Sequence, residues 1–180
     1  LSAGEYLIDR DWFSYQEVPP NPNDPTKYSN VPLTLTGPND HSAFIKISTS
    51  NSSSNENLAI TFESCTIILQ PEGASANRPV FLNGCAFRDC KIQVEYPDTP
   101  NPNDPDGDSA IYCQQSYLLF EDCVFENFAD VPAIYLNDAD VTLISCEFNN
   151  SNYGISGNGT ASVLQSQFDG TNAIARPFFS

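Results

Sequence analysis

The amino-acid sequence predicts an all-β solenoid, in which each short strand pairs in parallel with its counterpart one turn later. A short phrase with an apolar residue, a cysteine and a second apolar residue recurs along the chain. A second set of short apolar segments alternates with it, and Asn, Asp, Gly or Ser bounds both sets. The segments are rich in β-branched and aromatic residues, and no stretch has the apolar period of a helix.

The recurring phrase reads ITFESCTI, CAFRDCKI, LLFEDCVF, TLISCEF and VLQSQF, over residues 60–67, 85–92, 118–125, 142–148 and 163–168. Aligning the phrases gives a first apolar column of Phe62, Phe87, Phe120, Leu143 and Val163. The next column holds Cys65, Cys90, Cys123, Cys146 and Ser166. The third holds Ile67, Ile92, Phe125, Phe148 and Phe168. Such columns are typical of a solenoid, whose turns bury their side chains against the same positions of the next turn.

The alternating segments read PVFL, AIYC, AIYL, GIS and AIA, over residues 79–82, 110–113, 133–136, 154–156 and 173–175. Strands this short cannot form hairpins at such spacing and also keep like residues in register. Coiling them in parallel achieves both, so each coil is expected to carry two apolar segments joined by polar turns.

The [F/L]-x-x-C-x-[I/F] phrases and the AIY segments together resemble the right-handed parallel β-helix superfamily, the pectate-lyase-like solenoids. Leu33-Thr-Leu-Thr-Gly37 resembles an early-coil phrase of that group, and Gly4-Glu-Tyr-Leu-Ile8 looks like the strand that opens it. The resemblance covers residues 4–176. It implies a single-stranded right-handed β-helix of about six to seven coils, with residues 1–180 forming one domain.

The chain is also similar, in part, to bacterial surface proteins of the polymorphic outer-membrane type, whose coils alternate an Ala-Ile phrase with a Phe-and-Asn phrase. Val131-Pro-Ala-Ile134 lacks the paired glycines of that group, and Phe125-Glu-Asn127 has a different spacing.

The amino-acid composition limits which partners the protein could bind and in which compartment it would be found. The formal charge is −16 with only seven Lys and Arg residues, so nucleic acid and anionic membrane surfaces should be repelled. No apolar run reaches membrane-spanning length, which argues against membrane insertion. Few Lys and abundant Asn, Ser, Thr and Pro favour an extracellular or cell-surface protein, a secreted and processed chain. Self-association, or a cell-surface or carbohydrate partner, fits this composition.

The six cysteines are expected to be buried, reduced packing residues for the most part. Stacked residues lie about 4.7–4.9 Å apart, so disulfides between Cys65 and Cys90, or Cys123 and Cys146, are within reach. Ser166 continues the column, however, which favours a small and slightly polar interior side chain over a disulfide. Cys85 and Cys113 lie outside the column and could pair or stay free. A zinc site is not expected without a CxxC motif.

Two long lateral loops, 19–30 and 97–109, share the hexapeptide PNPNDP at 20–25 and 100–105. Long excursions on one side of a solenoid usually form a binding face, although duplication of an ancestral segment also explains the identity. The second loop contains the acidic residues Asp104, Asp106 and Asp108, alternating around a glycine. These oxygen ligands could wrap calcium, the one cofactor that the sequence leaves open, or could simply serve turn geometry.

Arg88 aligns between Glu63 and Glu121 of the neighbouring phrases. An ion-pair ladder is the expected interpretation, because like charges stacked directly on one another would be destabilising. A lone base in an acidic groove is the functional alternative. His41 stands alone in a loop and is expected to be solvated.

The ends of the solenoid are expected to need a cover, because a strand edge and an apolar cross-section are exposed there. Trp12 and Phe13 are candidates for one end, and Phe178 and Phe179 for the other end or for another subunit. Together with loop residues, the predicted assembly contacts are Trp12, Phe13, Asp24, Asp104, Phe178 and Phe179.

Three functions remain open. The leading hypothesis is a non-catalytic extracellular structural or adhesive module, such as a subunit of a fibre or surface appendage that assembles through coil ends and lateral loops. The second is a polysaccharide-active lyase or hydrolase, or a sugar-binding relative, around Glu63, Arg88 and Glu121. The resembled enzymes use carboxylate clusters, but their Asn-Thr-Asp, Asp-Asp and Gly-His-Gly phrases are absent. The third is a segment of a phage tail fibre or autotransporter passenger.

Overall fold

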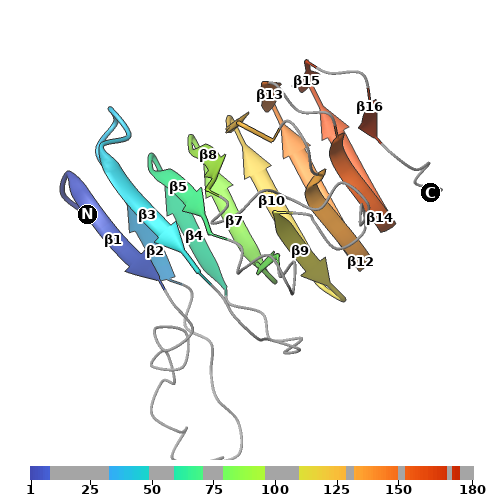
Figure 1. The fold of residues 1–180 in the computed structure, drawn as a ribbon, viewed down its shortest axis with the longest axis horizontal. Coiled ribbons are helices and arrows are strands. Elements are labelled where there is room, and N and C mark those ends of the chain that lie inside the picture. Colours follow the sequence, from blue (N-terminus) through green and yellow to red (C-terminus); the bar gives the residue numbers. More distant parts are fainter. Residues whose placement is uncertain are drawn as a thin grey trace, which may run out of the picture.

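The computed structural model describes residues 1–8, 33–48, 59–70, 79–95, 110–128, 132–149, 153–169 and 172–174. These residues form an all-β parallel β-solenoid with two parallel sheets and contain no helix. The strands follow one another in a row, with β1 and β16 at opposite ends of it (Figure 1). The described residues accordingly include no helix that could span a membrane.

The first sheet has seven strands, and each is the neighbour of the one a turn earlier. In order they are β1 (Gly4–Ile8), β3 (Ala43–Ile47), β5 (Thr66–Leu69), β8 (Lys91–Val94), β11 (Val124–Glu126), β13 (Glu147–Asn149) and β15 (Gln167–Phe168).

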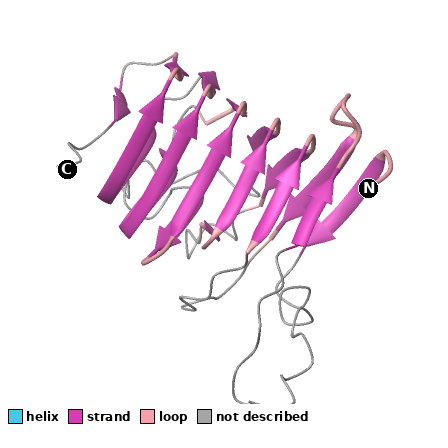
Figure 2. Cartoon of the chain, turned by 180° about the vertical axis from the view of Figure 1, so that it is seen from behind, coloured by secondary structure: helices cyan, strands magenta, loops and turns pink. Residues whose placement is uncertain are grey.

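The second sheet has nine strands, and Figure 2 shows the row from the opposite side. Its main path runs through β16 (Asn172–Ile174), β14 (Tyr153–Leu164), β12 (Pro132–Ile144), β10 (Tyr117–Glu121), β7 (Cys85–Arg88), β4 (Ile60–Glu63) and β2 (Leu33–Thr36). Off this path, β9 (Ile111–Gln114) pairs with β6 (Val80–Phe81) and with β12.

Strand register confirms the predicted columns. Phe62 lies opposite Phe87, which in turn lies opposite Phe120. Their rings stack almost parallel, with centroids 5.1 and 4.8 Å apart. In the first sheet one interior column runs through Tyr6, Ile45, Ile67, Ile92, Phe125, Phe148 and Phe168. The core is therefore a pair of apolar ladders, one on each sheet.

A left-handed residue makes the corner between the two sheets. The residue just before the cysteine position has a φ near +50° in successive coils, at Ser64, Asp89, Asp122, Ser145 and Gln165. Its N–H continues the ladder: that of Asp89 donates to the carbonyl of Glu121 at 2.9 Å. Asp and Ser accept this backbone conformation at low cost, because a short polar side chain can bond locally. The corner thus turns the chain without breaking the stack.

The solenoid has about four turns. A buried cysteine follows each corner except that at Gln165, which Ser166 follows. All six cysteines are free thiols, which confirms the packing interpretation and leaves Cys85 and Cys113 unpaired with each other.

Candidate functional site

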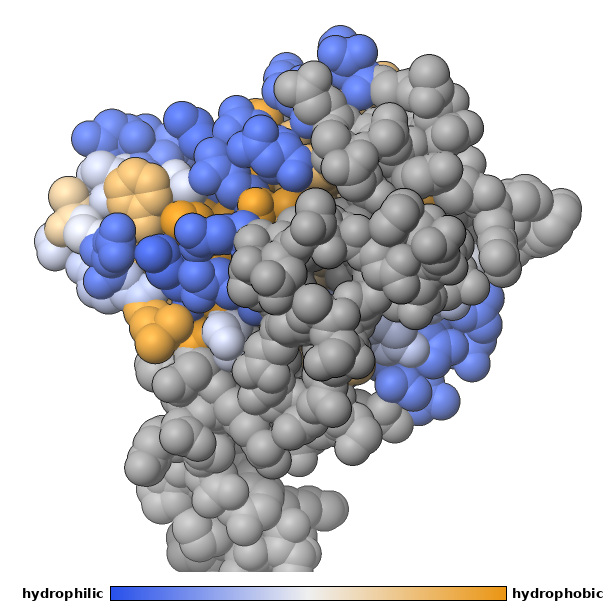
Figure 3. All heavy atoms as spheres, in the orientation of Figure 1, coloured by the Kyte–Doolittle hydropathy of each residue, from blue (hydrophilic) through white to orange (hydrophobic). Residues whose placement is uncertain are grey.

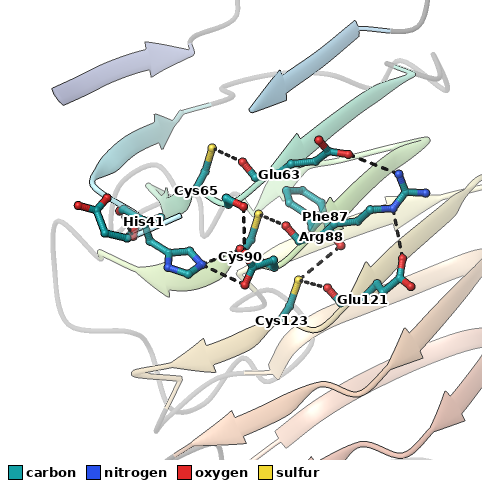
Figure 4. Close-up of polar contacts among 12 residues, drawn as sticks. His41, Glu63, Cys65, Phe87, Arg88, Cys90, Glu121 and Cys123 are labelled. Carbon is teal, nitrogen blue, oxygen red and sulfur yellow. Dashed lines mark hydrogen bonds and ion pairs between the residues drawn. The ribbon is translucent and has the colours of Figure 1, made fainter. Parts of the chain in front are cut away.

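The outer face of the second sheet carries a three-residue charge ladder. Register places Arg88 between Glu63 and Glu121 on β4, β7 and β10. Arg88 Nη1 lies 3.5 Å from Glu63 Oε1, and its Nε donates to Glu121 Oε2 at 3.2 Å. Thr36 Oγ1 also donates to Glu63 Oε2, at 3.1 Å. The predicted ion-pair ladder is confirmed, and Figure 4 shows the guanidinium between the two carboxylates.

The ladder brings two carboxylates to one face without making an acid–base pair. Glu63 and Glu121 are two strand spacings apart, about 9.6 Å between backbones, near the carboxyl separation of inverting glycosidases at about 6.5–9.5 Å. Glycoside hydrolysis requires one of the two to be a protonated acid. Here the guanidinium of Arg88 lies between the two carboxylates and bonds to both of them. The arrangement is an ion-pair ladder of two carboxylates that share one guanidinium.

His41 is not solvated, which corrects the expectation for this residue. Its imidazole is only 17% exposed, and Nε2 lies 2.8 Å from the carbonyl and 3.2 Å from the carboxylate of Asp89. Ser64 Oγ donates to the other oxygen of that carboxylate at 2.9 Å. Thr66 Oγ1 donates to the carbonyl of His41 at 2.9 Å. The insertion 38–42 in the first corner therefore closes over the corners of the next two coils.

This corner cluster holds Ser, Asp and His together in an order that does not suit nucleophilic catalysis. In a catalytic triad the imidazole lies between the carboxylate and the hydroxyl, so that it can accept the hydroxyl proton. Here Asp89 lies between Ser64 and His41 and contacts both. The contacts instead fasten the insertion to the solenoid.

The cysteine thiols that follow the corners form hydrogen bonds within their own coil and to the previous coil. The thiol of Cys123 donates to its own coil at the carbonyl of Glu121 (3.3 Å) and to the previous coil at the carbonyl of Phe87 (3.4 Å). Cys90 and Cys146 repeat the pattern. Burial raises the pKa of Cys65 to about 11 and that of Cys113 to about 12. Cys65 and Cys113 are therefore protonated packing thiols rather than nucleophiles.

An aromatic ladder on the second sheet escaped the sequence analysis. Tyr112 packs between Phe81 and Tyr135, with ring centroids 4.8 and 5.5 Å away, and its hydroxyl accepts a hydrogen bond from Asn137 Nδ2. The signal was present, because each ring occupies the same place in the PVFL, AIYC and AIYL segments. Tyr135 stacks on Tyr112 at 13°, and Phe81 packs against it at a tilt of 47°, so the neighbouring rings occupy the space that a stacked sugar would need.

The remaining predicted sites lie outside the described residues. They are the loops 19–30 and 97–109, the candidate calcium ligands Asp104, Asp106 and Asp108, and the contact residues Trp12, Phe13, Asp24, Phe178 and Phe179. Within the part of the chain that the structure describes, no group of three or more His, Cys, Asp or Glu side chains is arranged to hold a metal ion.

Comparison with known proteins adds no relative. No protein-family model, no curated protein and no solved structure matches the chain.

Proposed function

We propose that this chain is a non-catalytic structural or adhesive module of the cell exterior, which assembles through the ends of its solenoid. On this proposal it is a single right-handed β-helix of about six to seven coils. The lateral loops 19–30 and 97–109 would add side contacts, and the acidic, Lys-poor composition fits the extracellular setting.

One observation carries the proposal: on β14, near the C-terminal end of the described solenoid, an interior position is exposed. Val163 continues the column of Phe62, Phe87, Phe120 and Leu143, all of which are at most 1% exposed. Val163 itself is 39% exposed. A core position left in water is unfavourable, at roughly 25 cal/mol per Å² of apolar surface, and favours a contact that covers it.

The composition of the middle of the solenoid also supports the proposal. Glu63, Arg88 and Glu121 on its second sheet are paired with one another, its described interior is filled, and its thiols are buried. A regular, filled body with an open end suits a building block better than a site for chemistry.

Light scattering coupled to size-exclusion chromatography tests the proposal across a range of protein concentrations. We expect the mean mass to rise with concentration, and electron microscopy of the same samples to show elongated particles. A monomer mass at every concentration would contradict assembly. Release of reducing ends or unsaturated products from a polysaccharide panel would support the enzyme hypothesis in its place.

A further inference from the structure

Exposed large apolar side chains gather at the two ends of the described solenoid. Leu7 is 60% exposed on β1, and Leu1 is 45% exposed beside Thr36, whose carbonyl its nitrogen contacts at 2.6 Å. At the other end Val163 and Leu164 are 39% and 53% exposed on β14. Figure 3 shows apolar surface at the end where the N-terminal strands lie. Both ends therefore offer apolar surface to a partner.

Within the part of the chain that the structure describes, β1 and β15 are also the two edge strands of the first sheet. On β1, Gly4 N–H and Ile8 C=O bond to the β3 side, so the intervening alternate residues Glu5 and Leu7 point their backbone groups away from β3. On β15, the N–H groups of Gln167 and Asp169 bond to the β13 side, so the groups of Phe168 point away. Each edge needs a parallel neighbour to complete its hydrogen bonds.

The two ends carry little charge, which allows the neighbour to be another copy of this chain. The whole chain carries −16, so two copies repel one another unless their contact surfaces are nearly free of charge. Residues 158–169 at one end contain a single charged residue, Asp169. At the other end, residues 1–8 carry the side-chain charge of Glu5, which pairs with Lys46 at 3.7 Å, and the ammonium of Leu1, while residues 33–36 contain no charged residue.

Resting on the proposed function, we infer that two copies join head to tail, with β15 of one copy pairing in parallel with β1 of the next. Setting Phe168 opposite Tyr6 of the second copy continues the interior column that runs from Tyr6 to Phe168. In this register the outward backbone groups of Phe168 meet those of Glu5 and Leu7 of the second copy, as in the β13·β15 ladder.

The same register covers exposed apolar surface on the second sheet. Leu164 lies in the outward column that begins at Thr36. Because Leu1 lies beside Thr36, the stack places Leu1 of the second copy next to Leu164. Such an interface joins two different surfaces, so it leaves a free end on each side and permits further growth.

Two variants that block opposite ends test this polarity. Leu7→Pro removes an outward N–H and an exposed side chain, and it keeps the bonds of Gly4 and Ile8 to the β3 side. Val163→Asp places a charge on the open cross-section at a position already exposed. Tyr117→Asp is the matched control, because Tyr117 is 51% exposed but lies mid-solenoid on β10. Leu164→Asp replaces Val163→Asp if that variant melts early.

Sedimentation velocity of each variant alone and of the mixture gives the readout. We expect each blocked variant alone to associate at least about tenfold more weakly than the unmodified chain, and Tyr117→Asp to associate normally. Mixing the two blocked variants should produce dimers that grow no further, through the one intact pair of ends.

Three outcomes would overturn the inference. Dimers of one blocked variant alone would indicate pairing of like ends, and growth of the mixture beyond dimers, or unchanged association of both variants, would place the interface elsewhere. Pairing of like ends leaves the proposed function standing, because the ends of the solenoid still join. An interface elsewhere removes assembly through the ends as well, although the chain still associates. A monomeric unmodified chain would refute both.

Discussion

Ser166 Oγ accepts a hydrogen bond from the backbone N–H of Cys146, at 3.0 Å, across the step between two coils. The serine replaces the cysteine of the earlier coils and shows what that position does. It gives the corner of the previous coil a hydrogen-bond partner, while its own hydroxyl donates to the carbonyl of Leu164 at 3.0 Å. A thiol is a weak hydrogen-bond donor and a weak acceptor, and it packs in an apolar interior as a small hydrophobic group.

Replacing Cys123 separates hydrogen bonding from packing. Cys123→Ala should lower the free energy of unfolding by about 1–3 kcal/mol, because buried polar groups of the adjoining coils lose their partner. Cys123→Ser should cost less, since the hydroxyl keeps the bonds. Urea unfolding of both variants measures the difference. If alanine is tolerated as well as serine, the thiol is only a space-filling group.

The buried thiols predict a loss of stability at alkaline pH. Burial raises the pKa of Cys65 from an ordinary 9.0 to about 11, so above pH 9 the unfolded chain loses thiol protons that the folded chain retains. Its free energy of unfolding should therefore be intact below pH 9 and fall between about pH 9 and 11. Thiolate absorbance in the ultraviolet checks the cause. Absorbance of the folded protein that rises near pH 9 would contradict it.

The ion-pair ladder on the outer face should contribute little to stability. Arg88 is 49% exposed, and Glu63 and Glu121 are 32% and 40% exposed. Arg88→Gln should therefore lower the free energy of unfolding by about 1 kcal/mol or less, and added salt should shrink the effect. Lys91→Gln is the matched control on the first sheet, where the described residues show no ion pair for Lys91. A loss in Arg88→Gln that salt does not change would show that its contribution is not ionic.

Gly157 is required by the close approach of β12 and β14. A Cβ there would meet the carbonyl oxygen of Leu136, and its φ is +106°. Gly157→Ala should cost about 1–3 kcal/mol for crowding and about 1–2 kcal/mol more for the backbone. Gly4→Ala is the control, because its φ is also positive but nothing lies within 4 Å of an added Cβ. Thermal melts showing equal losses in the two variants would argue against crowding.

The columns could be read from the sequence because each coil repeats the same burial problem. An interior position needs an apolar residue in every turn, so alignment of the phrases alone identifies Phe62, Phe87 and Phe120 as interior residues. The same logic placed Arg88 between Glu63 and Glu121, since register fixes outward neighbours as firmly as inward ones.

Features that occur in one coil only could not be predicted by aligning the coils. His41 reaches Asp89 across 48 residues from an insertion in one coil, so no column records the contact. The left-handed corners could have been found, because Asp or Ser stands before the cysteine in four coils. Asp is among the residues that enter the left-handed region most readily, so its recurrence before the cysteine is a signal of backbone conformation.

Hydrogen–deuterium exchange at two protein concentrations tests the central claim, that the ends of the solenoid are its contact surfaces, most directly. On raising the concentration, we predict slower exchange in peptides that contain residues 1–8 and 158–169 and unchanged exchange in residues 85–95. Unchanged exchange at both ends, or new protection confined to the middle coils, would contradict the account.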